Sequence, residues 1–497
     1  MKHIRRNLLH LLLALTMVVV VIGNNTQSVY AAYETGAKGE DELYTVTFTY
    51  DPGTYSGEDQ VTSVGFFGSF VFYPSNLTGH TDQTGMLDNQ SIYTPHDYQP
   101  GMALMSSNYY EEMTYDETSK KYTLELKLPA GAYIYQYVVN AKLEEANPAN
   151  PMANVLTKEG FFRIAEGTYV ADPDLVYFYD TPKPEQAVPT CYVGTGAEVP
   201  YNPISDVTKR GKVSFEPYTD IKGDTRYIGV YLPANYDENA DKPYKVIFAS
   251  HGYSGDETHW FSLLGINNIM DNLIAEGRTE EAIVVTMNNT AYEYVPYQWQ
   301  FSTIKDNVLN YIIPFVEENY NVSTDPKDRA FCGLSMGSLT TLYMYMNATD
   351  SFDYFGAFSG GFKKGEGFDL SGEKLKDVKL MIGCGEEDFA YNHEVINVAA
   401  FMSELDKEGL EYTPYFVTGA HDMFTWPQMF TYFADNIVWS DHTKDDNAGQ
   451  SEAIANTNTE LPKTGEHSNL AGLTLLGLSV SCLFILYKRK RNSYEQS

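Results

Sequence analysis

"AFCGLSMGSLTTLYMYM" (residues 330–346) joins two apolar stretches through a serine that stands between two glycines. The first stretch has the short apolar run of a buried strand, and the second has the length and composition of a helix. Gly333-Leu334-Ser335-Met336-Gly337 therefore shows the G-x-S-x-G pattern in the strand-turn-helix context that this motif requires. The glycines permit a turn too sharp for side chains, and the turn pushes the serine hydroxyl clear of the backbone. Ser335 is thus a candidate nucleophile.

The region around this motif, residues 209–442, alternates short apolar runs rich in Val, Ile and Phe with helical patterns. Such alternation predicts a mostly parallel sheet covered on both faces, which is a doubly wound α/β domain. In these sheets functional residues gather at the carboxyl ends of the strands. Partners of Ser335 are therefore expected just after other strands.

A serine hydroxyl needs a base to become a nucleophile, and the base needs a carboxylate to orient it. Asp388 follows the strand-like run "VKLMIGCG" (378–385), and His421 follows "YTPYFVTG" (412–419). The order serine, acid, histidine is that of the α/β-hydrolases. Glu386 and Glu387 are rivals for the acid, whereas Asp422 is disfavoured because an immediate neighbour of His421 rarely reaches its ring.

Two backbone N–H groups are predicted to form an oxyanion hole. One belongs to Met336, at the start of the helix after Ser335. The other belongs to Tyr253 in "YKVIFASHGYSG" (244–255), where the preceding His251-Gly252 pair allows a tight backbone. His251 itself is interpreted as a residue that braces this loop.

A pocket wall is predicted in "MNNTAYEYVPYQW" (287–299), which follows another strand end. Asn288, Asn289 and Trp299 are the candidate substrate-binding residues, and the aromatic rings here could stack on an aryl acid or a sugar. Simple loop packing is the alternative interpretation.

Residues 42–180 are strand-like throughout. In "KYTLELKLPAGAYIYQYVVN" (121–140), apolar and polar residues alternate on both sides of a "PAG" turn, which predicts a hairpin. Several such pieces predict a β-sandwich. A proline-rich connector over 181–208 is expected to separate this sandwich from the α/β domain.

The two ends of the chain carry targeting patterns. Residues 1–32 have the basic start, apolar run and small residues of a secretory signal peptide. "LPKTG" (461–465), an apolar stretch over 470–487 and "KRKR" follow a polar tether over 443–460. This order resembles the sorting signal of sortase-anchored Gram-positive surface proteins. The resemblance implies cleavage between Thr464 and Gly465 and attachment to peptidoglycan, with a plain membrane-spanning anchor as the alternative.

Composition excludes several other classes of protein. The chain has 66 acidic and 34 basic residues and a formal net charge of −32, which argues against a nucleic-acid partner. Its four cysteines form neither a disulfide framework nor a zinc-binding spacing. We expect no metal and no cofactor.

The α/β region resembles a known family through "IFASHGYSGDETHWF", "RAFCGLSMGSLTTLYM", "GCGEEDFAY" and "GAHDMFTW". These motifs are similar to those of the esterase family that contains feruloyl esterases, acetylxylan esterases, S-formylglutathione hydrolase and mycolyltransferases. The resemblance implies an α/β-hydrolase fold with Ser335 as nucleophile, Asp388 as acid, His421 as base, and Tyr253 and Met336 as oxyanion donors.

The β region resembles the immunoglobulin-like early-set domains of polysaccharide-active enzymes, through "VGFFGSF" and the hairpin above. Together the resemblances imply a wall-anchored serine esterase that removes feruloyl or acetyl groups from plant polysaccharide such as xylan. The alternatives are an acyltransferase of the same fold and a non-catalytic surface protein that binds glycans. The glycan-binding role of the β region is likewise open, because such domains often serve only as spacers.

Overall fold

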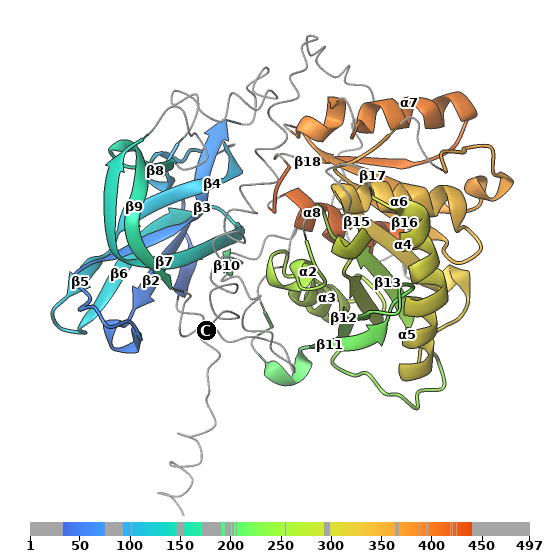
Figure 1. The fold of residues 1–497 in the computed structure, drawn as a ribbon, viewed down its shortest axis with the longest axis horizontal. Helices are drawn as coiled ribbons and strands as arrows, with labels where there is room; N and C mark the ends of the chain where they lie inside the picture. The colour runs from blue at the N-terminus through green and yellow to red at the C-terminus, as the bar shows by residue number, and fades with distance from the viewer. Residues whose placement is uncertain are drawn as a thin grey trace, which may run out of the picture.

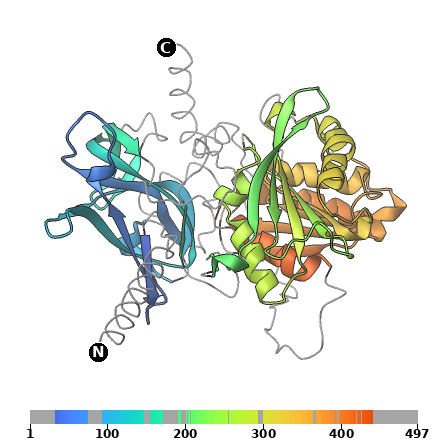
Figure 2. The same cartoon turned by 90° about the horizontal axis from the view of Figure 1, so that it is seen from below.

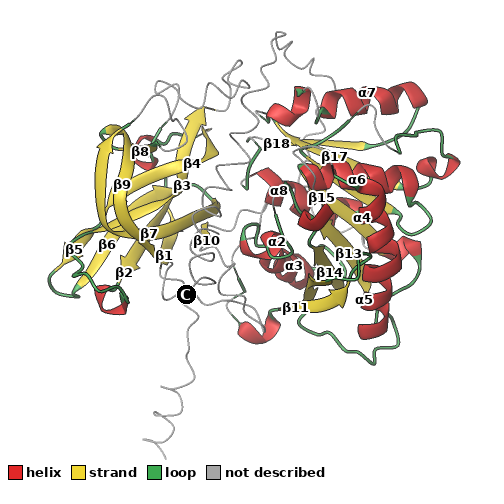
Figure 3. Ribbon diagram, viewed as in Figure 1, coloured by secondary structure: helices red, strands yellow, loops and turns green. Residues whose placement is uncertain are grey.

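The computed structural model describes residues 33–74, 93–100, 102–146, 154–170, 190–193, 200, 203–204, 206–253, 255–292, 299–362, 367–386, 388–393, 396–417, 419, 421–423 and 425–439. The expected signal peptide, polar tether and sorting signal lie outside these residues. Among the helices that are described, none is long and apolar enough to cross a membrane. The chain forms a unit built from strands and a unit in which helices flank a sheet (Figure 3).

The N-terminal unit contains two β-sheets with strand orders β1-β2-β6-β5 and β10-β7-β3-β4-β8-β9 (Figure 1). Neighbouring strands are antiparallel except for the β4–β8 pair, which is parallel. The strands are β1 Tyr33–Lys38, β2 Tyr44–Tyr50, β3 Val64–Pro74, β4 Met102–Glu112, β5 Thr114–Asp116, β6 Lys121–Leu128, β7 Gly131–Glu145, β8 Val155–Thr157, β9 Gly160–Val170 and β10 Thr190–Val193.

The two sheets bury one apolar face each against the other. In β2, Val46, Phe48 and Tyr50 are buried and alternate with half-buried threonines. The Phe48 ring lies 4.3 Å from the ring of Phe66 on β3, measured between centroids. Period-two patterns that face each other across two sheets produce the layered packing that the sequence predicts. The immunoglobulin-like assignment of this unit stays a prediction.

The limits of this unit differ from the expected 42–180. β1 lies before residue 42 and pairs with β2. β10 lies inside the stretch expected to be a linker, yet its four residues pair with β7, and Cys191 opposite Tyr133 is fully buried. β10 could not be predicted from this proline-rich stretch. So short a strand carries little local signal, and its pairing joins positions far apart in the sequence.

The C-terminal unit contains an eight-stranded sheet of order β11-β12-β14-β13-β15-β16-β17-β18. The strands from β14 through β18 in this order run parallel, and the β11–β12 hairpin adds two antiparallel strands at one edge. The strands are β11 Lys212–Thr219, β12 Thr225–Leu232, β13 Lys245–Ser250, β14 Ala282–Met287, β15 Arg329–Leu334, β16 Tyr354–Phe358, β17 Lys379–Gly385 and β18 Thr413–Val417.

Helices cover both faces of this sheet (Figures 1 and 2). One apolar core joins the sheet to α4, α5, α6 and α7, and a second core joins the other face to α2, α3 and α8. This is the α/β-hydrolase type of architecture that the alternating pattern predicts. The helices are α2 His259–Ser262, α3 Ile266–Ala275, α4 Phe301–Asn307, α5 Ile313–Asn319, α6 Met336–Asn347, α7 Val398–Glu408 and α8 Thr425–Tyr432, with π-helical turns at Val308–Ile312 and Phe433–Ile437.

A buried carboxylate ties the start of this unit to α3. Asp271 is 4% exposed, and its Oδ1 accepts hydrogen bonds from the Gly211 N–H and the Tyr231 hydroxyl, both at 2.7 Å. Burial raises the pKa of Asp271 to about 6, although these two donors and the charge of Arg210 act in the opposite direction. The charged form is thus disfavoured in the folded protein.

Replacing Asp271 with asparagine is expected to change how stability depends on pH. Because the folded-state pKa of Asp271 lies above its unfolded value, the wild type loses stability as pH rises from about 4 to about 6. The asparagine side chain keeps an oxygen for both donors and carries no charge, so the variant should gain up to about 3 kcal/mol relative to wild type between pH 4 and 7. Urea unfolding at the two pH values measures the gain. Asp241→Asn, at an exposed position, is the control, and an equal gain there would contradict the prediction.

Candidate active site

Ser335 occupies a strained turn between β15 and α6. Its φ and ψ are 54° and −117°, in a region that residues other than glycine rarely adopt. Its N–H donates a hydrogen bond of 2.8 Å to the carbonyl of Phe358, at the end of the neighbouring strand β16. A conformation of this kind costs about 1–3 kcal/mol and persists only where its surroundings enforce it. Strain at a half-buried serine hydroxyl is typical of functional sites.

The two glycines of the motif provide space for this turn. A Cβ on Gly337 would lie 2.2 Å from the carbonyl oxygen of Ser250, at the end of β13. A Cβ on Gly333 would lie 2.2 Å from the carbonyl oxygen of Gly337. Neither glycine has a positive φ, so the serine itself adopts the unusual conformation. The glycines are required because three backbone segments approach one another closely here.

The structure brings Ser335, His421 and Asp388 into a hydrogen-bonded chain. His421 Nε2 lies 2.8 Å from Ser335 Oγ, and His421 Nδ1 lies 2.9 Å from Asp388 Oδ1. Because a carboxylate can only accept, Nδ1 carries the proton, and Nε2 is left to accept the serine O–H. Ser335 and His421 are 86 residues apart in the sequence, and Asp388 and His421 are 33 apart. The fold therefore brings the three side chains together.

Asp388 is buried at the carboxyl end of β17. Its Oδ1 also accepts the Ala390 N–H at 2.8 Å, whereas Oδ2 is buried with no hydrogen-bond partner among the residues that the structure describes. An under-solvated carboxylate interacts strongly with a positive charge on the adjacent imidazole. Of its rivals, Glu386 is exposed and Glu387 lies outside the described residues, while Asp422 bonds to Thr425 at the start of α8.

Aromatic rings enclose the imidazole of His421, whose side chain is 10% exposed. The Phe389 ring lies 4.4 Å away and the Trp426 ring packs edge-on at 5.1 Å, both between centroids. The Phe389 ring also packs edge-on against His393, 5.6 Å away between centroids; burial lowers the pKa of His393 to about 4, and its Nδ1 accepts the Ile396 N–H at 3.2 Å. The surroundings of His421 are therefore largely apolar.

The two expected oxyanion residues both lie near Ser335 in the structure. Met336 is the first residue of α6, where helix N–H groups are not used by the helix itself. A Cβ on Gly252 would lie 3.3 Å from the Cβ of Ser335, so the Gly252-Tyr253 peptide adjoins the turn. The Tyr253 side chain is 38% exposed. The role of these two N–H groups in binding an oxyanion stays a prediction.

The expected substrate-binding residues contact other parts of the protein. Asn288 Nδ2 donates to Glu257 Oε2 at 2.7 Å, and Asn289 Nδ2 donates to Ser250 Oγ at 2.9 Å. Trp299 is buried and packs edge-on against the His251 ring, 5.7 Å away between centroids. In this conformation the three residues hold loops together, which is the alternative that the sequence left open. Of the nearby tyrosines, Tyr292 is buried, and Tyr294 and Tyr297 lie outside the described residues.

The loop interactions around His251 could not be found from the sequence. The His251 ring is fully buried, with Nδ1 2.6 Å from the Gly252 carbonyl oxygen and Nε2 accepting the Asn289 N–H at 2.8 Å. The expected bracing role of His251 agrees with these contacts. Within the described ranges, no group of three His, Cys, Asp or Glu side chains is arranged to hold a metal ion.

Two family models match the chain. Residues 220–434 match the family described as "Putative esterase", and residues 453–493 match the LPXTG cell wall anchor motif. The esterase match contains Ser335, Asp388 and His421. The anchor motif is that of a secreted protein covalently attached to the Gram-positive cell wall.

Curated relatives match part of the chain. An endo-1,4-beta-xylanase/feruloyl esterase of Xylanibacter ruminicola is 27% identical over 240 residues, which are 44% of this chain and 30% of the relative. Endo-1,4-beta-xylanase Y of Acetivibrio thermocellus is 32% identical over 225 residues, 39% of this chain and 20% of the relative. The chain thus spans less than a third of the length of these relatives.

A solved structure also resembles part of the chain. A CE1 ferulic acid esterase from the anaerobic fungus Anaeromyces mucronatus is 26% identical and covers 48% of this chain and 94% of its own, with a TM-score of 0.40. The family match lies within the α/β unit. Residues 220–434 of this chain thus match the esterase family, and residues 453–493 match the LPXTG cell wall anchor motif.

Proposed function

We propose that this protein is a serine carboxylic-ester hydrolase that removes acyl groups from plant polysaccharide such as xylan. The observation that carries the proposal is the hydrogen-bonded chain from Ser335 through His421 to Asp388, at 2.8 and 2.9 Å. The match to the esterase family and curated relatives named as xylanases and a feruloyl esterase support the substrate class.

The reaction begins when His421 Nε2 accepts the proton of Ser335 as Oγ attacks the ester carbonyl. Asp388 stabilises the imidazolium that forms and keeps its Nδ1 protonated. The imidazolium then protonates the departing alcohol oxygen, which leaves an acyl group on Ser335. A water molecule attacks this acyl-enzyme with the same base, and the free acid departs.

Negative charge develops on the carbonyl oxygen during both attacks. The backbone N–H groups of Tyr253 and Met336 are proposed to stabilise it, since both peptides adjoin Ser335. The dipole of α6, which begins at Met336, acts in the same direction. Neither contribution requires a metal ion or a cofactor.

The acyl group is proposed to be feruloyl. A curated relative is named as a feruloyl esterase. The rings of Phe389 and Trp426 beside His421 also offer apolar, aromatic surface of the kind that an aryl acid can pack against. An acetyl group would make little use of such surface.

The remaining regions are proposed to place the enzyme on its substrate. A sortase would cleave between Thr464 and Gly465 and join the protein to peptidoglycan, with residues 443–460 as a tether. The N-terminal unit is proposed to be an immunoglobulin-like early-set domain that binds glycan or spaces the esterase from the wall. Polysaccharide would then be deacylated at the cell surface.

Turnover on two substrates tests the proposal. The whole exported protein is assayed on a feruloylated arabinose ester and on acetylated xylan, with Ser335→Ala as the blank. We expect kcat/KM to be at least about tenfold higher for the feruloyl ester, with ferulic acid released into water. A tenfold preference for acetyl would overturn the acyl assignment. Release of product only as a new ester, when a sugar acceptor is added, would favour acyl transfer over hydrolysis.

A further inference from the structure

We propose that the segment Asn288–Thr290 positions the oxyanion loop, defined as residues 251–253 and 255–257, so that Asn288 and Thr290 are positioning residues for catalysis. The inference rests on the proposed function, because it concerns the stabilisation of the charge formed at Ser335. It replaces the expected substrate-binding role of Asn288 and Asn289 with a different one.

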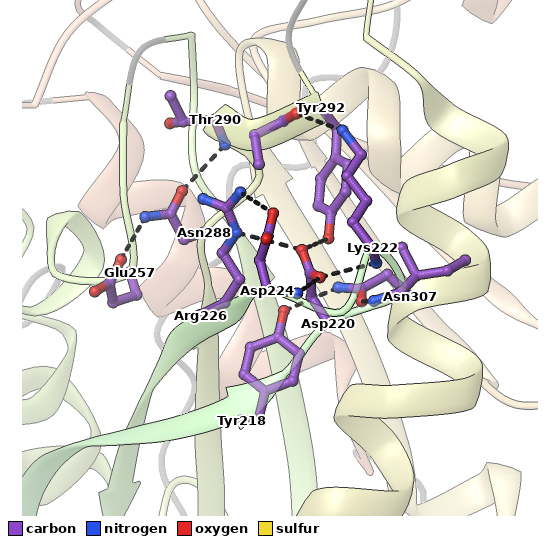
Figure 4. Close-up of polar contacts among 12 residues, drawn as sticks. Tyr218, Asp220, Lys222, Asp224, Arg226, Glu257, Asn288, Thr290, Tyr292 and Asn307 are labelled. Atoms are coloured by element: carbon purple, nitrogen blue, oxygen red, sulfur yellow. Dashed lines mark hydrogen bonds and ion pairs between the residues drawn. The ribbon is translucent and has the colours of Figure 1, made fainter.

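Three consecutive residues of this segment each bond to a different residue of the oxyanion loop. The Asn288 side chain donates to Glu257 Oε2 at 2.7 Å (Figure 4). The Asn289 N–H donates to His251 Nε2 at 2.8 Å, and the Thr290 hydroxyl donates to the carbonyl of Gly255. The loop is therefore attached on both sides of Tyr253.

These attachments determine the direction of the Tyr253 N–H. His251 Nε2 accepts from Asn289, so the ring proton is on Nδ1, which donates to the Gly252 carbonyl at 2.6 Å. The Gly255 N–H donates to the same carbonyl at 3.2 Å. The Gly252 C=O and the Tyr253 N–H belong to one planar peptide and point in opposite directions. Fixing the carbonyl therefore fixes the N–H.

The histidine ring in this linkage has little freedom to move. His251 is fully buried, and burial lowers its pKa to about 4, so it is neutral at physiological pH. A Cβ on Gly255 would lie 2.6 Å from His251 Nδ1, which shows how closely the loop wraps the ring. A donor held in place before the reaction needs no reorganisation when the oxyanion forms.

The positioning segment is itself anchored at both ends. It begins directly after β14, a fully buried central strand, and Thr286 on that strand donates to the carbonyl of Glu257. Two residues beyond its other end, the Tyr292 hydroxyl donates to Asp220 Oδ2 at 2.9 Å (Figure 4). Asp220 is buried in the turn of the β11–β12 hairpin and also accepts the N–H groups of Lys222 and Asp224. The oxyanion loop is thus linked to the sheet itself.

The Asn288–Glu257 hydrogen bond is tested by exchanging which of the two side chains is the donor. In Asn288→Asp, Oδ1 can still accept the Thr290 N–H, as it does now at 3.1 Å, but the second oxygen faces the Glu257 carboxylate and repels it. We expect kcat to fall by about tenfold or more, with KM changed less than about threefold, because removal of a whole oxyanion donor costs about 10²–10³ in kcat. Adding Glu257→Gln supplies an amide donor to the new carboxylate and should restore most of kcat.

A matched pair elsewhere provides the control. Asn235 Nδ2 donates to Glu281 Oε1 at 3.1 Å at an exposed position. Asn235→Asp should leave kcat unchanged, with or without Glu281→Gln. A raised KM in Asn288→Asp, with unchanged kcat and no recovery in the double variant, would show that Asn288 contacts substrate and would overturn the proposal.

Thr290 gives an independent measurement if Asn288→Asp does not fold. Thr290→Val removes the hydroxyl that bonds to Gly255 and keeps the shape, whereas Thr290→Ser retains the hydroxyl. We expect kcat to fall in the valine variant and to recover in the serine variant, and equal kcat in both would overturn the proposal. Loss of the proposed function is recognised separately, because Ser335→Ala would then remain active.

Discussion

Replacing Ser335 with alanine is expected to lower ester turnover by about three orders of magnitude or more, because the variant has no nucleophile to form the acyl-enzyme. His421→Ala should be slowed to a similar degree, since Ser335 Oγ would lose the base that lies 2.8 Å away. Steady-state assays on a soluble feruloyl ester, with enzyme in excess of contaminating hydrolases, measure the loss.

The double variant tests whether Ser335 and His421 act as one unit, and thermal unfolding tests whether the substitutions affect folding. Residues that act as one unit are not additive, so the double variant should be about as slow as either single variant. Alanine tolerates the strained conformation at position 335 no better than serine, and we therefore expect similar thermal unfolding of wild type and Ser335→Ala. Turnover within tenfold of wild type in either single variant would refute the triad.

Asp388→Asn is the second substitution with a large expected effect, about 10⁴-fold in kcat. An asparagine amide presents N–H groups where the carboxylate accepts, so the imidazole would turn to the tautomer that is protonated at Nε2. That nitrogen could no longer accept the proton of Ser335. The measurement is kcat as a function of pH, in which the wild-type plateau should be lost.

Glu386→Gln is the matched control for Asp388→Asn. Glu386 lies two residues away and is exposed, so its variant should keep wild-type kcat. If Glu386→Gln or Glu387→Gln were slowed and Asp388→Asn were not, a different carboxylate would orient His421. The 2.9 Å contact between Asp388 and His421 would then not be the functional one.

Local patterns in the sequence were sufficient to predict much of the structure of the α/β unit. The run 330–334 is continuous, apolar and followed by a serine between glycines, and it forms β15 before the turn into α6. Asp388 and His421 could be chosen because each follows a strand whose apolar run is evident. Strand ends of a parallel sheet share one edge, so their proximity follows from the fold class.

What the sequence could not predict depends on contacts between distant positions. Asn288 and Glu257 are 31 residues apart, and Tyr292 and Asp220 are 72 apart. A polar residue after a strand end can face a ligand or a neighbouring loop, and no local pattern distinguishes these cases. The prediction for Trp299 differs from the structure for the same reason. Its aromatic ring was expected to stack on substrate, but it packs against His251.

The strand β10 has a consequence for anyone who divides this chain. A fragment that stops at residue 180 would leave the edge of β7 between Gly131 and Ile134 without its neighbour, and exposed edges of this kind pair with other molecules. A fragment that begins at 181 would carry β10 ahead of the α/β unit without β7, the strand with which it pairs. Pro200 accepts a hydrogen bond from Asn272 on α3 and so belongs with the α/β unit. A cut between Val193 and Pro200 therefore keeps β10 with the N-terminal unit and Pro200 with the α/β unit.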